Sequence, residues 1–315
     1  MKLKRYAGNP ILRTSSNWWE SEVVLNPGAT MYQDKVYLLY RAQGRDGISR
    51  LGLATSSDGF NFERFAKPVF EGDENNRFER LGVEDARMTK IGDDCYICYT
   101  AASVYPLSEA DKAPPLIALP PELSHVVPPY RVRATIVKTD DFKNFERVCV
   151  ALPETDTKDL AIFPGRISGK YFMLHRIYPH MCLACSDDLR HWQDLGILAR
   201  TREEFWDSER VGAGAPPIRT SKGWLLFYHG TDRTHTYRLG TMLLDLNDPS
   251  RILYRSDEPI FEPEEPYEKE GHVKNVVFTC GVVERDDQYF VYYGAADKAI
   301  GLATIEKDAF LASLG

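Results

Sequence analysis

Charged side chains stand at the start of otherwise apolar segments at several places along this chain. Asp85 lies in the run Gly82-Val83-Glu84-Asp85-Ala86-Arg87, where an arginine and a second carboxylate flank it. A carboxylate beside an arginine at the start of an apolar strand is a candidate acid/base group. The same arrangement also serves as a simple ion pair that fixes the end of a strand, so the motif by itself leaves both interpretations open.

Basic side chains follow in the middle of the chain and suggest a place for an anion. They are Arg131, Arg133, Arg147, Lys158 and His175, the last two standing in Lys158-Asp159 and His175-Arg176. Cations that converge from several segments form an anion site, whereas a single Lys or Arg is more often a solvated surface group. Arg147 lies in a Phe-Glu-Arg that repeats Phe62-Glu63-Arg64, so it also fits a residue at the edge of a repeated unit.

The elements that must position these side chains repeat five times. In each unit a segment of polar or small residues precedes a short turn, and an aromatic-rich strand follows. The polar segments begin at Asn26, Glu84, Lys158, Gly212 and Lys274. Repetition of an all-strand unit at this length predicts a β-propeller. We therefore expect an all-β fold, a five-bladed β-propeller that forms a single domain over residues 1–315, with the polar segments converging on its central axis.

Composition excludes several classes of protein. The chain has 46 acidic and 39 basic side chains and a net charge of −7, and it lacks the basic excess of a nucleic-acid-binding surface. No apolar run reaches the roughly 18 residues that span a bilayer, and no signal peptide follows the basic start. We therefore expect a cytoplasmic protein without nucleic-acid or membrane partners.

Two Cys-x-x-Cys pairs raise the question of a metal. They are Cys95 with Cys98 and Cys182 with Cys185, and both fall in strand-like segments. Residues three apart in a strand point to opposite faces of the sheet, so the two thiols cannot easily share one ion. We expect buried free thiols and no metal site.

An insertion interrupts the second unit at about 106–130. Its proline pairs prevent regular strand pairing, while its many apolar residues argue against disorder. Long loops in compact domains are often lids or interfaces. We expect this one to wall off the part of the cavity that accepts the leaving group, or to contact another subunit of a homo-oligomer.

Taken together, the motifs resemble glycoside hydrolase family 130, the β-mannoside phosphorylases. The similarity runs from about Asn9 to Ala303, and the motifs in chain order are N-P-G-A, L-Y-R, G-V-E-D-A-R, K-D-L-A-I-F-P, M-L-H-R, G-A-G-A-P-P, F-Y-H-G and Y-Y-G-A-A-D. The resemblance implies that inorganic phosphate, a co-substrate and not a cofactor, cleaves a β-mannosidic bond. It also implies inversion at the anomeric carbon and release of α-mannose 1-phosphate. The pattern is closest to the branch that acts on β-1,2-linked mannobiose and oligomannosides.

The resemblance also gives roles to individual positions. Asp85 matches the catalytic proton donor, which acts through the 3-hydroxyl of the bound mannose. The phosphate-binding set is Arg131, Arg147, Lys158 and His175, with Arg133 as a rival to the first two. The mannose-binding set is Asn26, Arg41, Glu84, Arg87, His229 and Asp297, with His229 expected at the cavity rim.

Physical reasoning supports a phosphorylase and leaves two alternatives. An inverting hydrolase needs a second carboxylate to activate water, whereas phosphate is already a nucleophilic anion and needs cations around it. In the first alternative, an inverting β-1,2-mannosidase, the base would be Glu84, Asp159 or Glu209. In the second, the propeller binds glycans without catalysis, because one fold serves many functions.

Overall fold

The structure is a computed structural model that describes residues 1–104 and 130–314. The expected insertion at about 106–130 therefore lies outside the described residues, apart from Tyr130. Strands dominate the described chain, and the expected all-β fold is confirmed. The helical segments are short: η1 (Trp18–Glu20), α1 (Pro266–Lys269) and α2 (Lys307–Ala312). No helix in the described ranges is long and apolar enough to cross a membrane.

The strands form five antiparallel groups, which are numbered here in chain order. Group 1 consists of β3 (Val23–Tyr32), β4 (Lys35–Gln43), β5 (Ser49–Ser56) and β6 (Glu63–Arg64). Group 2 consists of β7 (Gly82–Ile91), β8 (Asp94–Val104), β9 (Tyr130–Thr139) and β10 (Glu146–Val150). Group 3 consists of β11 (Lys158–Ile162), β12 (Tyr171–Ile177), β13 (His180–Ser186) and β14 (Trp192–Ala199).

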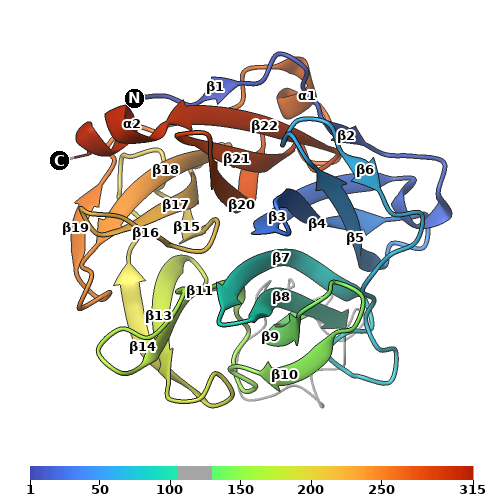
Figure 1. Cartoon of the computed structure of the whole chain (residues 1–315), viewed down its shortest axis with the longest axis horizontal. Helices are drawn as coiled ribbons and strands as arrows, with labels where there is room; N and C mark the ends of the chain where they lie inside the picture. The colour runs from blue at the N-terminus through green and yellow to red at the C-terminus, as the bar shows by residue number, and fades with distance from the viewer. Residues whose placement is uncertain (105–129, 315) are drawn as a thin grey trace, which may run out of the picture.

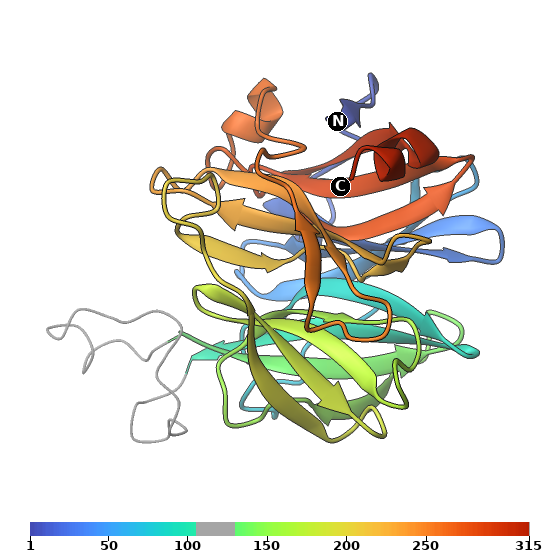
Figure 2. The same cartoon turned by 90° about the vertical axis from the view of Figure 1, so that its left-hand side faces the viewer.

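Group 4 consists of β15 (Arg210–Ala213), β16 (Ile218–Arg219), β17 (Trp224–Thr231), β18 (Tyr237–Leu244) and β19 (Ile252–Arg255). Group 5 consists of β20 (Val277–Arg285), β21 (Gln288–Ala295) and β22 (Ala299–Glu306), with β1 (Lys4–Arg5) and β2 (Leu12–Arg13) paired to β22. A single parallel pair, Ser49 with Gly82, joins groups 1 and 2 into one sheet. Figure 1 shows the five groups arranged around a common centre, with β3, β7, β11, β15 and β20 nearest to it; Figure 2 shows the same groups from the side.

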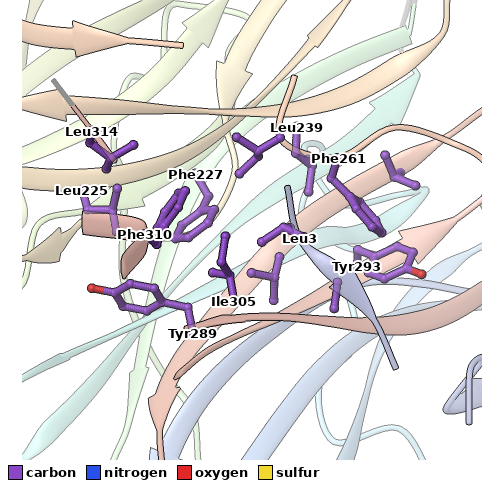
Figure 3. Packing of buried hydrophobic residues seen from close by; sticks show 14 of the residues in the cluster. Leu3, Leu225, Phe227, Leu239, Phe261, Tyr289, Tyr293, Ile305, Phe310 and Leu314 are labelled. Carbon is purple, nitrogen blue, oxygen red and sulfur yellow. The ribbon is translucent and has the colours of Figure 1, made fainter. Parts of the chain in front are cut away.

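The hydrophobic core lies between neighbouring groups. Five clusters of buried side chains each join two groups, and one of them joins group 5 back to group 1 through residues such as Leu302 and Leu38. Figure 3 shows the cluster between groups 4 and 5, in which Phe227 packs beside Phe310 and Tyr289. Apolar burial of this kind stabilises each group against its neighbours.

A buried contact among a tyrosine, a carboxylate and an arginine recurs in four groups of the described chain. The tyrosine hydroxyls donate to the carboxylates over 2.7–2.9 Å. The four sets are Tyr40–Glu20–Arg64, Tyr99–Glu79–Arg147, Tyr228–Asp207–Arg255 and Tyr293–Glu268–Arg5. In group 3, His175 on β12 takes the tyrosine's place, 3.0 Å from the Thr157 hydroxyl and 3.2 Å from Asp194. We call these contacts the tyrosine–acid–arginine sets.

Candidate active site

The main cavity, about 460 Å³ in volume, lies where the inner strands of the five groups meet. Its polar lining falls into two sets according to the strand groups. Asn26, Arg41, Asp85 and Asp297 come from groups 1, 2 and 5, whereas Lys158, Arg176 and Arg210, which we call the cationic end, come from groups 3 and 4. Aromatic residues also line the cavity, among them Tyr130, Tyr178 and Tyr237. The cavity therefore combines a site rich in carboxylates and hydrogen-bonding groups with a cationic site.

Three of the polar residues at the cavity come from bulged inner strands. Asn26, Asp85 and Asp159 have φ angles of 46°, 54° and 58°, and each lies where strand pairing shifts register in β3, β7 or β11. Asn and Asp tolerate the left-handed region better than other residues with a Cβ. A bulge redirects a side chain out of the regular alternation of a strand. This repeated device aims one polar group from each of three strands toward the centre.

Asp85 is held by polar groups from group 1. Asn26 Nδ2 donates to Asp85 Oδ1 over 2.9 Å, and Arg41 Nη1 lies 3.6 Å from the same oxygen. Arg41 Nη2 is 2.8 Å from Glu84 Oε1, and that oxygen also accepts a 3.0 Å hydrogen bond from Tyr130. Burial disfavours the charged form of Asp85, but Arg41 and Lys158 outweigh burial and lower its pKa. The carboxyl group is therefore ionised at neutral pH.

Asp297 is the second carboxyl group in this part of the cavity and behaves in the opposite way. Burial, opposed by Arg41 and reinforced by the charge of Asp85, raises the pKa of Asp297 to about 6. Two neighbouring carboxyl groups whose pKa values are pushed apart are typical of sites that transfer protons.

A buried ionic cluster forms the floor beneath the cavity. Asp159 lies 2.8 Å from Arg176 Nε, 3.4 Å from Arg87 Nη2 and 3.4 Å from His229 Nε2. Burial opposes ionisation of Asp159, but Arg176 and the other neighbours prevail and hold its pKa well below the ordinary value. Burial lowers the pKa of His229 to about 4. Arg87 also donates to the carbonyls of Ala213 and Gly214, which fixes β7 against group 4.

The cationic end holds two arginines that the sequence analysis did not assign. Arg176 extends from β12, and Arg210 stands at the start of β15 with its guanidinium 5.3 Å from the Tyr178 ring and 5.6 Å from the Tyr237 ring. Lys158 Nζ lies 3.7 Å from Glu84 Oε2. Within the part of the chain that the structure describes, Arg210 has no carboxylate partner within 4.0 Å. Its positive charge is therefore available to an anionic ligand.

The structure brings together one part of the expected site and leaves another part elsewhere. Asn26, Arg41, Asp85, Lys158 and Asp297 line the main cavity. Glu84 and Arg87 do not line the cavity but contact residues that do: Glu84 pairs with Arg41 and Lys158, and Arg87 donates to the Asp85 carbonyl. His229 is fully buried in the floor and does not stand at the rim.

The four expected phosphate ligands and the rival Arg133 lie in different parts of the structure. Of them only Lys158 lines the cavity. Arg131 and Arg133 are buried beside Asp156, Arg147 belongs to the tyrosine–acid–arginine set of Glu79, and His175 contacts Thr157 and Asp194. The alternation of a strand explains the last placement, because adjacent residues face opposite sides and Arg176, not His175, faces the cavity. That period-two pattern was the signal that could have identified Arg176.

Comparison with known proteins agrees with these features. The sequence profile of glycoside hydrolase family 130, described as β-1,4-mannooligosaccharide phosphorylase, matches residues 2–314. A 1,2-β-oligomannan phosphorylase from Thermoanaerobacter sp. (strain X514) is 40% identical over 314 residues, covering 97% of this chain and 98% of the relative. A β-1,2-mannobiose phosphorylase of the same organism is 39% identical, with 98% of both chains covered.

Solved structures with the same fold include enzymes of two kinds. The β-1,2-mannobiose phosphorylase from Listeria innocua, in complex with β-1,2-mannobiose, superposes with a TM-score of 0.83 at 29% identity and covers 100% of this chain and 99% of its own. A second structure was reported for family members that are glycoside hydrolases targeting β-1,2 mannosidic linkages in Candida mannan. It superposes with a TM-score of 0.85 at 28% identity and covers 96% of this chain and 93% of its own. On the match of the profile and the identity to relatives along almost the whole sequence, this chain belongs to glycoside hydrolase family 130.

Proposed function

We propose that this protein is an inverting phosphorylase of β-mannosides, with β-1,2-linked mannobiose or oligomannosides as substrates and α-mannose 1-phosphate as product. The names of the two relatives that are 39–40% identical over almost the entire chain support this substrate class. The observation that carries the reaction type is the cationic end of the main cavity. Lys158, Arg176 and Arg210 stand there, where a hydrolase would need a carboxylate base.

In this reaction the bond between the anomeric carbon and the glycosidic oxygen breaks while a phosphate oxygen bonds to the same carbon from the opposite face. Asp85 supplies the proton that the leaving oxygen needs, by way of the 3-hydroxyl of the mannose. Asn26, Arg41 and Asp297 hold that mannose. Phosphate at the cationic end would offset the charge of Lys158, which lowers the pKa of Asp85. Binding of the anion therefore favours the protonated form of Asp85 that catalysis requires.

The hydrolase alternative lacks a suitable base. Asp159 is ion-paired with Arg176 and Arg87, and its low pKa makes it a weak proton acceptor. Glu84 is occupied by Arg41, Lys158 and Tyr130. Glu209 lies 3.7 Å from the exposed Arg233 and does not line the main cavity. A non-catalytic glycan-binding role would give no reason for the acid Asp85 in a cavity that also holds three cations.

We also propose that the fold is a single-domain, five-bladed β-propeller in which each strand group is one blade. The five apolar clusters support this architecture, because they join every group to the next and group 5 to group 1. A propeller brings the inner strands of all blades to one axis. That geometry accounts for a cavity whose lining comes from every group.

The test is to incubate the purified protein with β-1,2- and β-1,4-mannobiose, each with and without phosphate, and to identify the sugars released. We expect α-mannose 1-phosphate from the β-1,2-linked substrate, formed only with phosphate. Asp85→Asn should lower the turnover by roughly 10²–10⁴, the usual contribution of a positioned general acid, with an unchanged circular dichroism spectrum. Free mannose formed at the same rate without phosphate would replace the proposal with the hydrolase.

A further inference from the structure

A second cavity, about 720 Å³ in volume, adjoins the main cavity and has no part in the reaction as described above. Its lining includes the polar side chains of Glu22, Gln43, Arg45, His272 and Lys298, together with Val23 and three glycines. Carboxylate, amide, imidazole and ammonium groups are the donors and acceptors that hydrogen-bond to hydroxyl groups. These five polar side chains therefore suit a neutral, hydroxyl-rich ligand.

The second cavity lies beside the part of the main cavity that is lined by Asn26, Arg41 and Asp297, because four chain segments contribute residues to both cavities. The pairs, with the main-cavity residue first, are Asn26 and Val23, Arg41 and Gln43, Val273 and His272, and Asp297 and Lys298. Residues three apart in a strand are separated by about 10 Å. A ligand that extends by this length from Asn26 and Arg41 along β3 and β4 therefore reaches the second cavity.

The stereochemistry of inversion indicates on which side of the mannose the leaving sugar lies. Nucleophile and leaving group occupy opposite faces of the anomeric carbon in an inverting displacement. The cations that would hold phosphate come from groups 3 and 4, whereas the second cavity is built from group 1 and from the segments of group 5 at Gly271–His272 and Lys298. Figure 1 shows β11 and β15 across the centre from β4. A leaving sugar on the face opposite a phosphate held by these cations would depart toward the second cavity.

We infer that the second cavity binds the mannosyl units of the leaving oligosaccharide that lie beyond the unit attached to the cleaved bond. It is thus a chain-length subsite, and it favours oligomannosides over mannobiose. This inference rests on the proposed phosphorylase function. It assigns Arg45 and Lys298 as residues that contact the far end of the substrate and not the reacting atoms.

The test compares Arg45→Ala and Lys298→Ala with the wild-type enzyme on a series of β-1,2-linked substrates from mannobiose to mannopentaose at saturating phosphate. Each variant should lower kcat/KM for the longest substrate by roughly fivefold to tenfold, the loss expected for one or two hydrogen bonds. The kcat/KM of each variant for the shortest substrate that turns over should stay within about twofold of the wild-type value, because that substrate does not reach the second cavity.

The matched control is Arg233→Ala. Arg233 lies 3.7 Å from Glu209 with 80% of its side chain exposed, and Arg45 lies 3.6 Å from Glu22 with 92% exposed. The control should leave the whole series unchanged. The inference is overturned if both variants leave the ratio of kcat/KM for the longest substrate to kcat/KM for the shortest substrate unchanged. A wild-type enzyme that phosphorolyses no β-mannoside overturns the proposed function itself, so the two failures are distinguishable.

Discussion

The surroundings of Asp85 and Asp297 give two neighbouring carboxyl groups different affinities for a proton. Asp85 could be placed at the cavity from the sequence, because an aspartate beside an arginine at a strand start is a recognisable pattern. Arg176 and Arg210 could not, because a basic residue in a strand reveals its function only when its direction is known. The choice of His175 over its neighbour shows how a shift of one residue moves a side chain from the cavity to the opposite face of the strand.

Asp297→Asn should stabilise the folded protein at neutral pH. Burial raises the pKa of Asp297 to about 6, so the folded state binds this proton more tightly than the unfolded state, whose pKa is near 3.8. The ionised form therefore costs stability above pH 6, by about 3 kcal/mol at most. Replacement by Asn removes that cost at pH 7, and the gain should shrink as pH falls from 6 toward 4. Denaturant unfolding at pH 5, 6 and 7 measures it.

Asp46→Asn is the control of opposite sign. A hydrogen bond from Arg50 lowers the pKa of Asp46, so this substitution should weaken the protein at pH 7 or leave it unchanged. A stability gain for Asp297→Asn that is equal at all three pH values would show that its ionisation is not the cause. The variant should also lose phosphorolysis, since Asp297 holds the mannose in the proposed mechanism.

At the scale of strands, the tyrosine–acid–arginine sets connect the outer strand of four groups to the segment that precedes the inner strand. The repeated Phe-Glu-Arg at Arg64 and Arg147 indicated one part of this pattern in the sequence, and in the structure both arginines contact the carboxylate of such a set. Each of the four carboxylates directly follows an aromatic residue and precedes the inner strand of its group, as in Trp19-Glu20 and Trp206-Asp207. The arginine that each one contacts lies on another strand, so the ion pair itself is seen only once the strands are assembled.

Tyr228→Phe should lower the free energy of unfolding by roughly 1.5–3 kcal/mol, the range for a hydrogen bond to a charged group. The hydroxyl donates over 2.9 Å to Asp207, a carboxylate that is fully buried. Tyr254→Phe on β19 is the matched control, because the Tyr254 hydroxyl makes no hydrogen bond within residues 1–104 and 130–314. Urea unfolding of both variants should separate them clearly, while kcat stays unchanged. Equal stability of the two variants would show that the set does not stabilise group 4.

At the scale of the whole molecule, the repeated strand-rich units predicted an all-β fold, and the structure confirms it. The two-residue strands β1 and β2 were not expected, because segments that short carry no readable alternation. Their pairing with β22 is non-local, between the two ends of the chain. The prediction for the insertion at about 106–130 falls outside the described residues and stays a prediction.

Deletion of residues 1–13 should destabilise the protein by more than any single substitution above. The deletion exposes the edge of β22, removes the buried Leu3 and Leu12, and takes away Arg5, which lies 2.8 Å from the fully buried Glu268. A buried carboxylate that loses its partner costs about 3–5 kcal/mol. Thermal unfolding with light scattering should show a lower midpoint and earlier aggregation, because an open strand edge pairs with other chains. Deletion of Met1 and Lys2 alone is the control, and an equal midpoint for both truncations would contradict the prediction.

The left-handed bulges also limit how this enzyme can diverge. A position with φ near 54°, such as Asp85, accepts Asp, Asn or Gly readily and penalises every other residue type. Substitution there leads mainly to Asn, an inactive amide, or to Gly, which has no side chain, and seldom to a new catalytic group. Lys158 and Arg210, in contrast, lie outside the positive-φ positions, so they can change without a backbone penalty. New activities on this scaffold should therefore arise by exchange of the anion-binding residues around an acid that stays fixed.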